Sequence, residues 1–201
     1  GEYEKEMEEA KAEQERRMKL VEFKGEKIHR FELEVLNQIV DEINEDYKKQ
    51  RLADPELEIK NIDINEIHSV IRDNSVVEIS LEKKYLTKIP KSIGGLTNLI
   101  ELNLNNNQIS EITDLDNLIG LRRVRLEGNQ ISKITGIDNL IALEYLILND
   151  NQISEIDGLD NLTALQVLYL KGNQISKITG LDNLIALQWL VLDDNQISEI
   201  D

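Results

Sequence analysis

From Leu99 onward the sequence repeats itself every 22 residues. In register, the units are LIELNLNNNQISEITDLDNLIG (99–120), LRRVRLEGNQISKITGIDNLIA (121–142), LEYLILNDNQISEIDGLDNLTA (143–164), LQVLYLKGNQISKITGLDNLIA (165–186) and LQWLVLDDNQISEID (187–201). A fixed period in this range is typical of a solenoid, in which one supersecondary unit stacks on the next. Such folds usually present a long curved surface to another molecule. The repeat therefore predicts a binding scaffold, although it does not identify the partner.

Each unit opens with apolar residues that alternate, as Leu102 and Leu104 do in the first one. Alternation is typical of a short strand with one buried face. A single unit cannot bury that face alone, so the units must stack at the roughly 4.8 Å spacing of a parallel sheet. An asparagine follows each strand; these are Asn107, Asn129, Asn151, Asn173 and Asn195. Turned inward, they would pair with loop amides that are otherwise buried, which predicts a structural ladder and not a binding site.

The pattern L-x-x-L-x-L-x-x-N-x-I-x-x-I-x-x-L-x-x-L resembles the leucine-rich repeat family, specifically the 22-residue class of type-1 protein phosphatase regulators and bacterial internalins. The resemblance covers residues 76–201, where the unit at 76–98 is one residue longer and has Lys84 in place of the asparagine. It implies an α/β fold: a leucine-rich repeat solenoid with a parallel β-sheet on the concave face and an α-helical N-terminal cap. It also implies a protein partner held by the concave face, without saying which protein.

A change in composition before the repeats divides the chain into three parts. They are a charged extension at 1–26, a helical N-terminal cap at 27–75 and the repeat array at 76–201. The extension has dense charge and strong helix formers, which indicates a solvated helix or a partly disordered tail. A coiled coil is the alternative, although Gln14 and Arg17 interrupt its seam. The array contains one 23-residue unit, four 22-residue units and one truncated unit.

Apolar residues in the cap recur with helical spacing. We therefore expect a helix over 27–50, whose apolar face is wide enough to be buried against the end of the solenoid. A second, short helix is expected around 63–72, with Asp63 as its N-cap. A turn at 73–75 would then lead to the first strand.

Composition excludes several classes of partner. A net charge of −16 argues against nucleic acid, whose phosphates need clustered lysine and arginine, and against anionic membrane surfaces. No apolar run approaches the 18 or so residues of a membrane span, so we expect no membrane insertion. The chain has no cysteine, which favours a reducing compartment and a cytoplasmic location.

Catalytic chemistry has little support in the sequence. The two histidines, His29 and His68, lie beside neither a nucleophile nor a second metal ligand, and no glycine-rich phosphate loop is present. The acids Asp150, Asp193 and Asp194 follow strands and could gather a calcium ion, but solvated loop acids explain them better. We therefore expect a protein that is not an enzyme and has no cofactor, catalytic residue or metal site.

A comparison of units 121–142 and 165–186 predicts where a partner binds. They differ at Arg122/Gln166, Arg123/Val167, Val124/Leu168, Arg125/Tyr169, Glu127/Lys171 and Ile137/Leu181. Apart from two conservative apolar exchanges, every difference falls on an outward position of the strand segment, while the exposed return side is unchanged. Neutral drift should have changed both sides, so selection on the concave face is the better explanation.

The outward strand positions supply the candidate site. They are polar in the first half of the array and apolar or aromatic in the second, and tryptophan, tyrosine and arginine are enriched in binding hot spots. The predicted partner-binding residues are Arg122, Arg123, Arg125, Tyr145, Ile147, Val167, Tyr169, Trp189 and Val191. The alternative for Trp189 is that it packs against a missing neighbour, because it lies in the last strand.

Two classes of function remain open. One is a protein-interaction scaffold; the other is a structural or assembly module of a larger chain or homo-oligomer, with no dedicated small-ligand site. The sequence stops fifteen residues into a unit, so we expect a poorly covered apolar edge and possible self-association there. That edge would comprise Leu187, Leu190, Leu192, Ile197 and Ile200.

Overall fold

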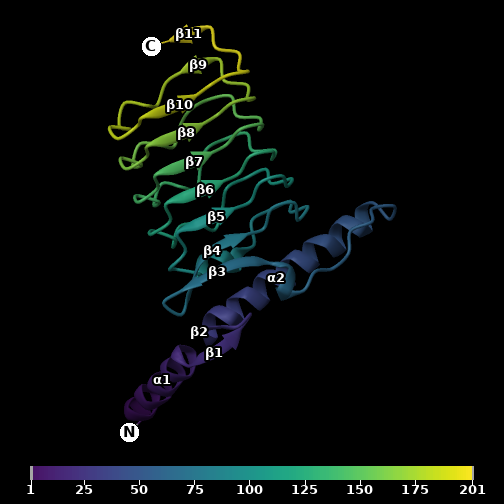
Figure 1. Ribbon diagram of the computed structural model, residues 1–201, viewed down its shortest axis with the longest axis vertical. Helices are drawn as coiled ribbons and strands as arrows, with labels where there is room; N and C mark the ends of the chain where they lie inside the picture. The colour runs from purple at the N-terminus through teal and green to yellow at the C-terminus, as the bar shows by residue number, and fades with distance from the viewer. Residues whose placement is uncertain (1, 201) are drawn as a thin grey trace.

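The computed structural model describes residues 2–200 of the protein, with the side chains of residues 5–198. The repeat units stack along the long axis of the molecule, and the helices gather at its N-terminal end (Figure 1). The elements before the array are α1 (Glu2–Met18), β1 (Leu20–Phe23), β2 (Glu26–His29), α2 (Arg30–Ala53), a 3-10 turn η1 (Ile64–Glu66) and β3 (His68–Arg72). Those of the array are β4 (Ser75–Ser80), the 3-10 segment η2 (Lys91–Gly95), β5 (Glu101–Asn103), β6 (Arg123–Arg125), β7 (Tyr145–Ile147), β8 (Val167–Tyr169), β9 (Lys177–Ile178), β10 (Trp189–Val191) and β11 (Glu199–Ile200).

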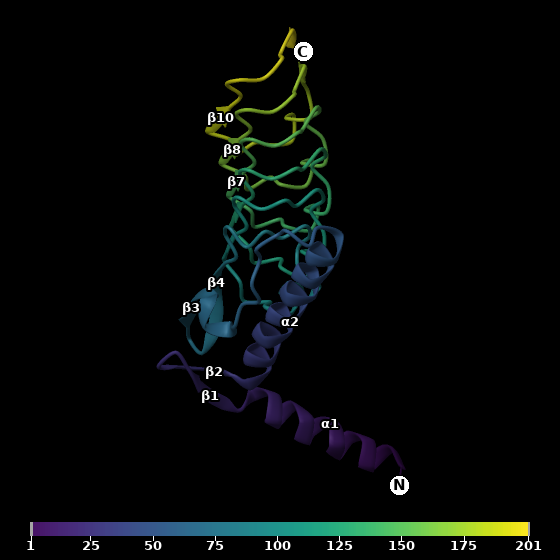
Figure 2. The ribbon, with the colours of Figure 1, turned by 90° about the vertical axis from the view of Figure 1, so that its right-hand side faces the viewer.

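One seven-stranded sheet runs the length of the array in the order β10-β8-β7-β6-β5-β4-β3. All neighbours are parallel except β3, which pairs with β4 in the antiparallel sense. Register advances by one whole unit from strand to strand, so Arg123 lies between Glu101 and Tyr145. The strands lie on one side of the stack and the return loops on the other (Figure 2). The predicted solenoid with a parallel sheet and a helical N-terminal region is confirmed.

The core is a continuous stack of leucine and isoleucine rows. In the unit that begins at Leu99, the inward residues Leu102, Leu104 and Ile109 are fully buried, and the equivalents in the next three units are as well. Burying each such side chain contributes about 1.5–3 kcal/mol. The last described unit is less covered, because Leu187, like Leu190, Leu192 and Ile197, is only partly buried. The side chain of Ile200 lies outside the described part.

The asparagines form the predicted ladder. At Asn151, the side-chain oxygen accepts the N–H of Ile131 at 3.0 Å. Its amide nitrogen donates to the carbonyls of Leu126 at 2.9 Å and Leu148 at 3.1 Å. Each ladder asparagine therefore joins its own unit to the one before. Because all these groups are shielded from water, the ladder satisfies backbone atoms that would otherwise be buried and unpaired.

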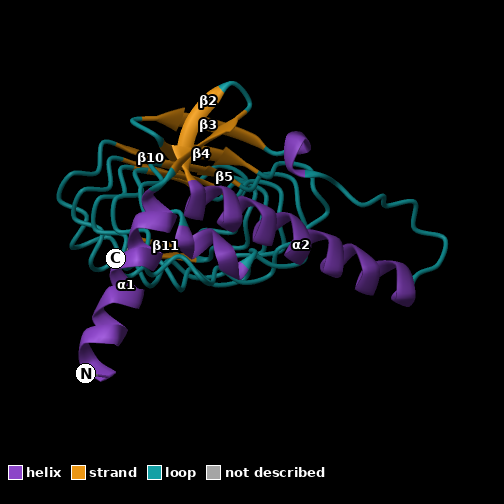
Figure 3. Ribbon diagram, turned by 90° about the horizontal axis from the view of Figure 1, so that it is seen from below, coloured by secondary structure: helices purple, strands orange, loops and turns teal. Residues whose placement is uncertain are grey.

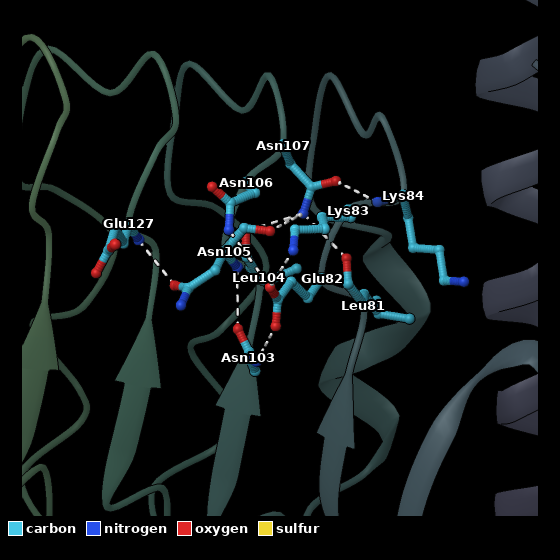
Figure 4. Close-up of polar contacts among 10 residues, drawn as sticks. All are labelled: Leu81, Glu82, Lys83, Lys84, Asn103, Leu104, Asn105, Asn106, Asn107 and Glu127. Atoms are coloured by element: carbon cyan, nitrogen blue, oxygen red, sulfur yellow. Dashed lines mark hydrogen bonds and ion pairs between the residues drawn. The ribbon is translucent and has the colours of Figure 1, made fainter.

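The ladder ends at the 23-residue unit, where Lys84 replaces the asparagine. Asn107 reaches across from the next unit and accepts the N–H group of Lys84 at 2.9 Å (Figure 4). It also accepts the N–H group of Leu86 at 3.1 Å. The carbonyl of Lys84 accepts a hydrogen bond from the hydroxyl of Tyr47, on α2. The cap helix thus takes over the role that a preceding unit would have.

Helix α2 lies across the N-terminal end of the stack and closes its core (Figure 3). Its inward face buries Leu36, Ile39 and Ile43. Beside them, the carboxylate of Asp46 accepts the backbone N–H of Thr87 at 3.0 Å and its hydroxyl at 2.7 Å. Apolar burial and specific polar contacts therefore both attach the cap to the first unit.

Two parts of the expected cap are wrong. Residues 26–29 form β2 and pair with β1 across a turn at Lys24 and Gly25, whose φ angles are 51° and 81°. The expected helix over 27–50 therefore begins at Arg30 and extends to Ala53. Positive φ at both central residues gives the turn whose twist matches a hairpin, and it reverses the chain before the helical period starts.

The short helix expected around 63–72 is reduced to one 3-10 turn. Asp63 does cap it, through a bond from the N–H of Asn65 at 2.7 Å. Residues 68–72 instead form β3, which pairs with β4 across a turn at Asp73 and Asn74 with φ of 50° and 64°. The turn expected at 73–75 is present, but it joins two strands.

A buried carboxyl in α2 predicts a pH dependence. Glu32 is fully buried, and its carboxylate accepts the N–H of Val76 at 3.1 Å. Burial raises its pKa more than that hydrogen bond lowers it. A folded pKa above the unfolded one means that the group's stabilising contribution is present at low pH and is lost as pH rises through the folded pKa.

We therefore expect the free energy of unfolding of Glu32→Gln, relative to wild type, to increase from pH 4.5 to pH 7.5, because the amide carries no charge that burial could penalise. Urea titrations between pH 4.5 and pH 7.5 check this: the gain over wild type should grow with pH. The exposed neighbour Glu34, changed to Gln, serves as control. A gain that is constant across this range would show that ionisation of Glu32 is not its cause.

Candidate functional site

The third and fifth residues of each unit point outward from the sheet and make two columns along its concave face. The third-position column comprises Glu78, Glu101, Arg123, Tyr145, Val167 and Trp189, which lie side by side in the register of the strands. The fifth-position column comprises Ser80, Asn103, Arg125, Ile147, Tyr169 and Val191. Eight of the nine predicted contact residues lie in these columns.

In the polar half of the face, one acid holds two arginines. The carboxylate of Glu101 lies 3.0 Å from the Arg125 guanidinium and 3.5 Å from that of Arg123. The Arg123 guanidinium also lies over the Tyr145 ring, 5.1 Å from its centre. The side chain of Arg125 is 41% exposed and that of Arg123 is 47% exposed. Two positive charges thus share one negative charge at the surface.

The remaining predicted arginine is placed differently. Arg122 precedes β6, and its guanidinium lies 2.7 Å from the carboxylate of Glu144 in the next unit. Since it is in neither column, it forms a separate ion pair. The structure brings Arg123 and Arg125 together with Tyr145, but it does not bring Arg122 into that group.

The other half of the face is apolar. Trp189 is 58% exposed, whereas Val167, its neighbour in register, is only 6% exposed. Val167 lies between Tyr145 and Trp189 and offers little surface of its own. The partly exposed Tyr169 completes a patch of large side chains over β7, β8 and β10.

Sequence reasoning missed the acid that organises the arginines. Glu101 lies one unit before Arg123, and the 22-residue spacing alone puts the two side by side, so the signal was present. A second acid, Glu82, accepts the side-chain amide of Asn103 at 3.1 Å (Figure 4). That bond keeps the pKa of Glu82 below its usual value. At the rim, Lys171 lies 3.4 Å from Asp194.

The described side chains can be compared with what a metal site and a membrane-spanning helix require. Among the side chains of residues 5–198, no three of His, Cys, Asp or Glu are grouped so that they could hold a metal ion. The ring of His29 stacks on Phe31, with ring centres 6.0 Å apart. None of the described helices is both long enough and apolar enough to cross a membrane.

The comparisons with known proteins agree with this geometry. The sequence model of the family described as Leucine Rich repeats (2 copies) matches residues 97–139 and 141–183. The structure is similar to that of an internalin from Listeria monocytogenes, at 28% identity and a TM-score of 0.59, over 81% of this chain and 46% of that one. The chain therefore spans less than half of the internalin's length.

Two further solved structures share the fold. A leucine-rich repeat protein from Leptospira interrogans is 28% identical, with a TM-score of 0.56, over 62% of this chain and 36% of its own. The leucine-rich repeat ectodomain of a receptor kinase from Arabidopsis thaliana is 24% identical, with a TM-score of 0.54, over 77% and 95% respectively. No curated protein sequence matches the chain. The asparagine ladder, the matching repeats and these structures lead to one conclusion: residues 97–139 and 141–183 are leucine-rich repeats, and the chain has a leucine-rich repeat fold similar to that of the internalin.

Proposed function

We propose that the protein is an interaction scaffold, not an enzyme, and that it binds a partner protein through the concave face of its repeat array. One observation carries the proposal. The two most similar units differ, apart from conservative apolar exchanges, only at outward positions of the strand segment, and Arg123, Arg125 and Tyr169 are among them. The fold has no need of these side chains in its core, so their divergence is best explained by recognition.

The size and exposure of the apolar patch support the same proposal. More than half of the Trp189 surface is exposed. Interfaces are enriched in aromatic residues, and exposed apolar patches rimmed by polar residues mark interaction sites. Tyr169 on β8 and Trp189 on β10 belong to the same continuous sheet as the arginines of β6, two and three strands away from them. A protein partner is favoured over nucleic acid because the chain carries a net charge of −16.

The test uses Trp189→Ala and Tyr169→Ala, singly and together. A partner captured from a lysate by the intact chain is purified, and its dissociation constant is measured for each variant by calorimetry. Each substitution should weaken binding by about 2 kcal/mol, the usual scale of a hot spot. The melting temperature should not fall, because both side chains project away from the core.

A matched variant with Gln152→Ala and Gln174→Ala alters two exposed residues on the return side and should bind as wild type does. Equal binding by the Trp189/Tyr169 double variant would refute the proposal. The competing assembly function predicts self-association instead, so light scattering over a concentration series separates the two: a monomer at all concentrations contradicts the assembly function.

A further inference from the structure

The arginine pair has unused capacity to bind an anion. A guanidinium has five N–H donors, yet Arg123 and Arg125 make one ion-pair contact each, and both to Glu101. Elsewhere on the polar half of the face, Arg72 is neutralised by Glu78 at 2.8 Å. Among the described ion pairs, Glu101 is thus the one carboxylate shared by Arg123 and Arg125, although Glu82 and Glu127 also lie beside these columns.

The register of the strands fixes the distance between the arginine pair, Arg123 and Arg125, and the apolar patch at Tyr169 and Trp189. Parallel strands are spaced at roughly 4.8 Å, so Tyr169 on β8 and Trp189 on β10 lie about two and three spacings from β6, or about 10–14 Å. An extended peptide advances about 3.3 Å per residue and covers this distance in three or four residues. An α-helix, at about 1.5 Å per residue, would need seven to nine.

The width of the face favours the extended form. Its two columns are the third and fifth residues of each strand and are therefore only about 7 Å apart along the strand direction. A helix with its side chains is about 10–12 Å across. The columns are also bounded by the Arg122–Glu144 ion pair on one side and by the partly exposed Glu127 on the other.

We infer that the concave face binds an extended peptide segment of its partner, in which an Asp or Glu side chain lies three or four residues from a bulky apolar one. The inference rests on the proposed function. The carboxylate binds the spare N–H groups of Arg123 and Arg125, which form bidentate contacts with planar acids. The apolar side chain packs on Tyr169 and Trp189. The partner therefore meets charge at β6 and apolar surface at β8 and β10.

A random 12-residue display library, selected on the full chain, tests the inference. Enriched sequences should share an acid and a bulky apolar residue at a spacing of three or four. Synthetic peptides are then measured by fluorescence polarisation against wild type and an Arg123→Gln, Arg125→Gln variant. The dissociation constant should rise at least tenfold, as is usual when a hydrogen bond to a charged group is lost. A Lys91→Gln, Lys133→Gln variant removes the same charge away from the columns and should bind normally.

Changing the peptide's acid to its amide should cost about the same factor, and the two changes together should cost no more than either alone. Peptides that depend on Tyr169 and Trp189 but bind the arginine variant equally well would overturn the inference and leave the proposed function intact. An enriched spacing of seven to nine, a requirement for phosphoserine, or no enrichment would also overturn it. Binding that survives the Tyr169→Ala, Trp189→Ala double variant would instead refute the proposed function.

Discussion

Replacing Asn151 by alanine is expected to lower the free energy of unfolding by about 3 kcal/mol or more. The side-chain oxygen accepts the Ile131 N–H, and the two N–H hydrogens of the amide are shared among three carbonyls, those of Leu126, Leu148 and Asn149. Alanine cannot replace any of these bonds. The N–H of Ile131 is left buried without a partner, which costs about 1–3 kcal/mol, and each carbonyl loses one of two bonds, since the three also accept from Asn129, Asn173 and Gly128. Urea denaturation followed by far-UV circular dichroism measures the loss.

Two further alanine variants serve as controls for Asn151→Ala. The adjacent Gln152 is exposed, so Gln152→Ala should change stability by less than about 0.5 kcal/mol. The equivalent Asn195 makes the same kinds of bonds but is only partly buried, so its alanine variant should lose less than the Asn151 variant. If Asn151→Ala were as mild as Gln152→Ala, the ladder would not hold the units together.

Alanine at Gly158 should be at least as damaging, for a different reason. Gly158 has a φ of +73°, and a Cβ there would lie 2.2 Å from the carbonyl oxygen of Ile134 in the preceding unit. Because this oxygen belongs to the backbone, it cannot move away from the added Cβ as the end of a flexible side chain could. Left-handed strain alone costs about 1–2 kcal/mol, and the overlap forces adjacent return loops apart, so we expect a loss of more than about 3 kcal/mol.

Two other glycines separate these contributions. Gly25 has a φ of +81° but open space around it, so Gly25→Ala carries the strain without the overlap and should cost about 1–2 kcal/mol. Gly120 has neither, so Gly120→Ala should be neutral or slightly stabilising. Thermal denaturation of the three variants should rank Gly158 worst, then Gly25, then Gly120. Equal losses at Gly158 and Gly25 would show that the close approach is harmless.

The array could be predicted from the sequence because its units provide their own alignment. Five copies of the same Asn-x-Ile step define which residues face inward, and the positions of Asn107 and Asn151 follow directly. Stacking then requires no long-range information beyond the period. The sheet, its register and the ladder are consequences of one pattern seen several times.

The cap could not be predicted as well, because each of its strands is short and occurs once. Ile28 lies on the same helical stripe as the buried residues of α2, so helical spacing extends naturally through it. The turn at Lys24 and Gly25 pairs residues 26–29 with β1, so the helix begins only at Arg30. In the same way, the β-branched Val70 and Ile71 fit either a helix or a strand until the turn after them pairs the segment with β4.

The candidate site could be predicted from the sequence better than the cap but less completely than the array. The outward columns followed from alternation, so Tyr169 and Trp189 could be placed on one face. The exposure of each side chain depends on the size of its neighbours in the stack, which is why Val167 is covered although it is an outward residue. The neutralisation of the arginines likewise depends on Glu101, one unit away. Pairing across units is a property of the assembled face.

The ladder has a consequence for how such an array can be rearranged. Because every junction is made by the same asparagine bonds, the order of the outward side chains is independent of what holds the units together. Units 121–142 and 165–186 share their inward residues except for conservative apolar exchanges. Exchanging these two units whole would preserve each junction and move the two arginines next to Trp189. The repeat units can therefore be exchanged for one another, and their order determines where along the sheet a bound partner contacts charged side chains and where it contacts apolar ones.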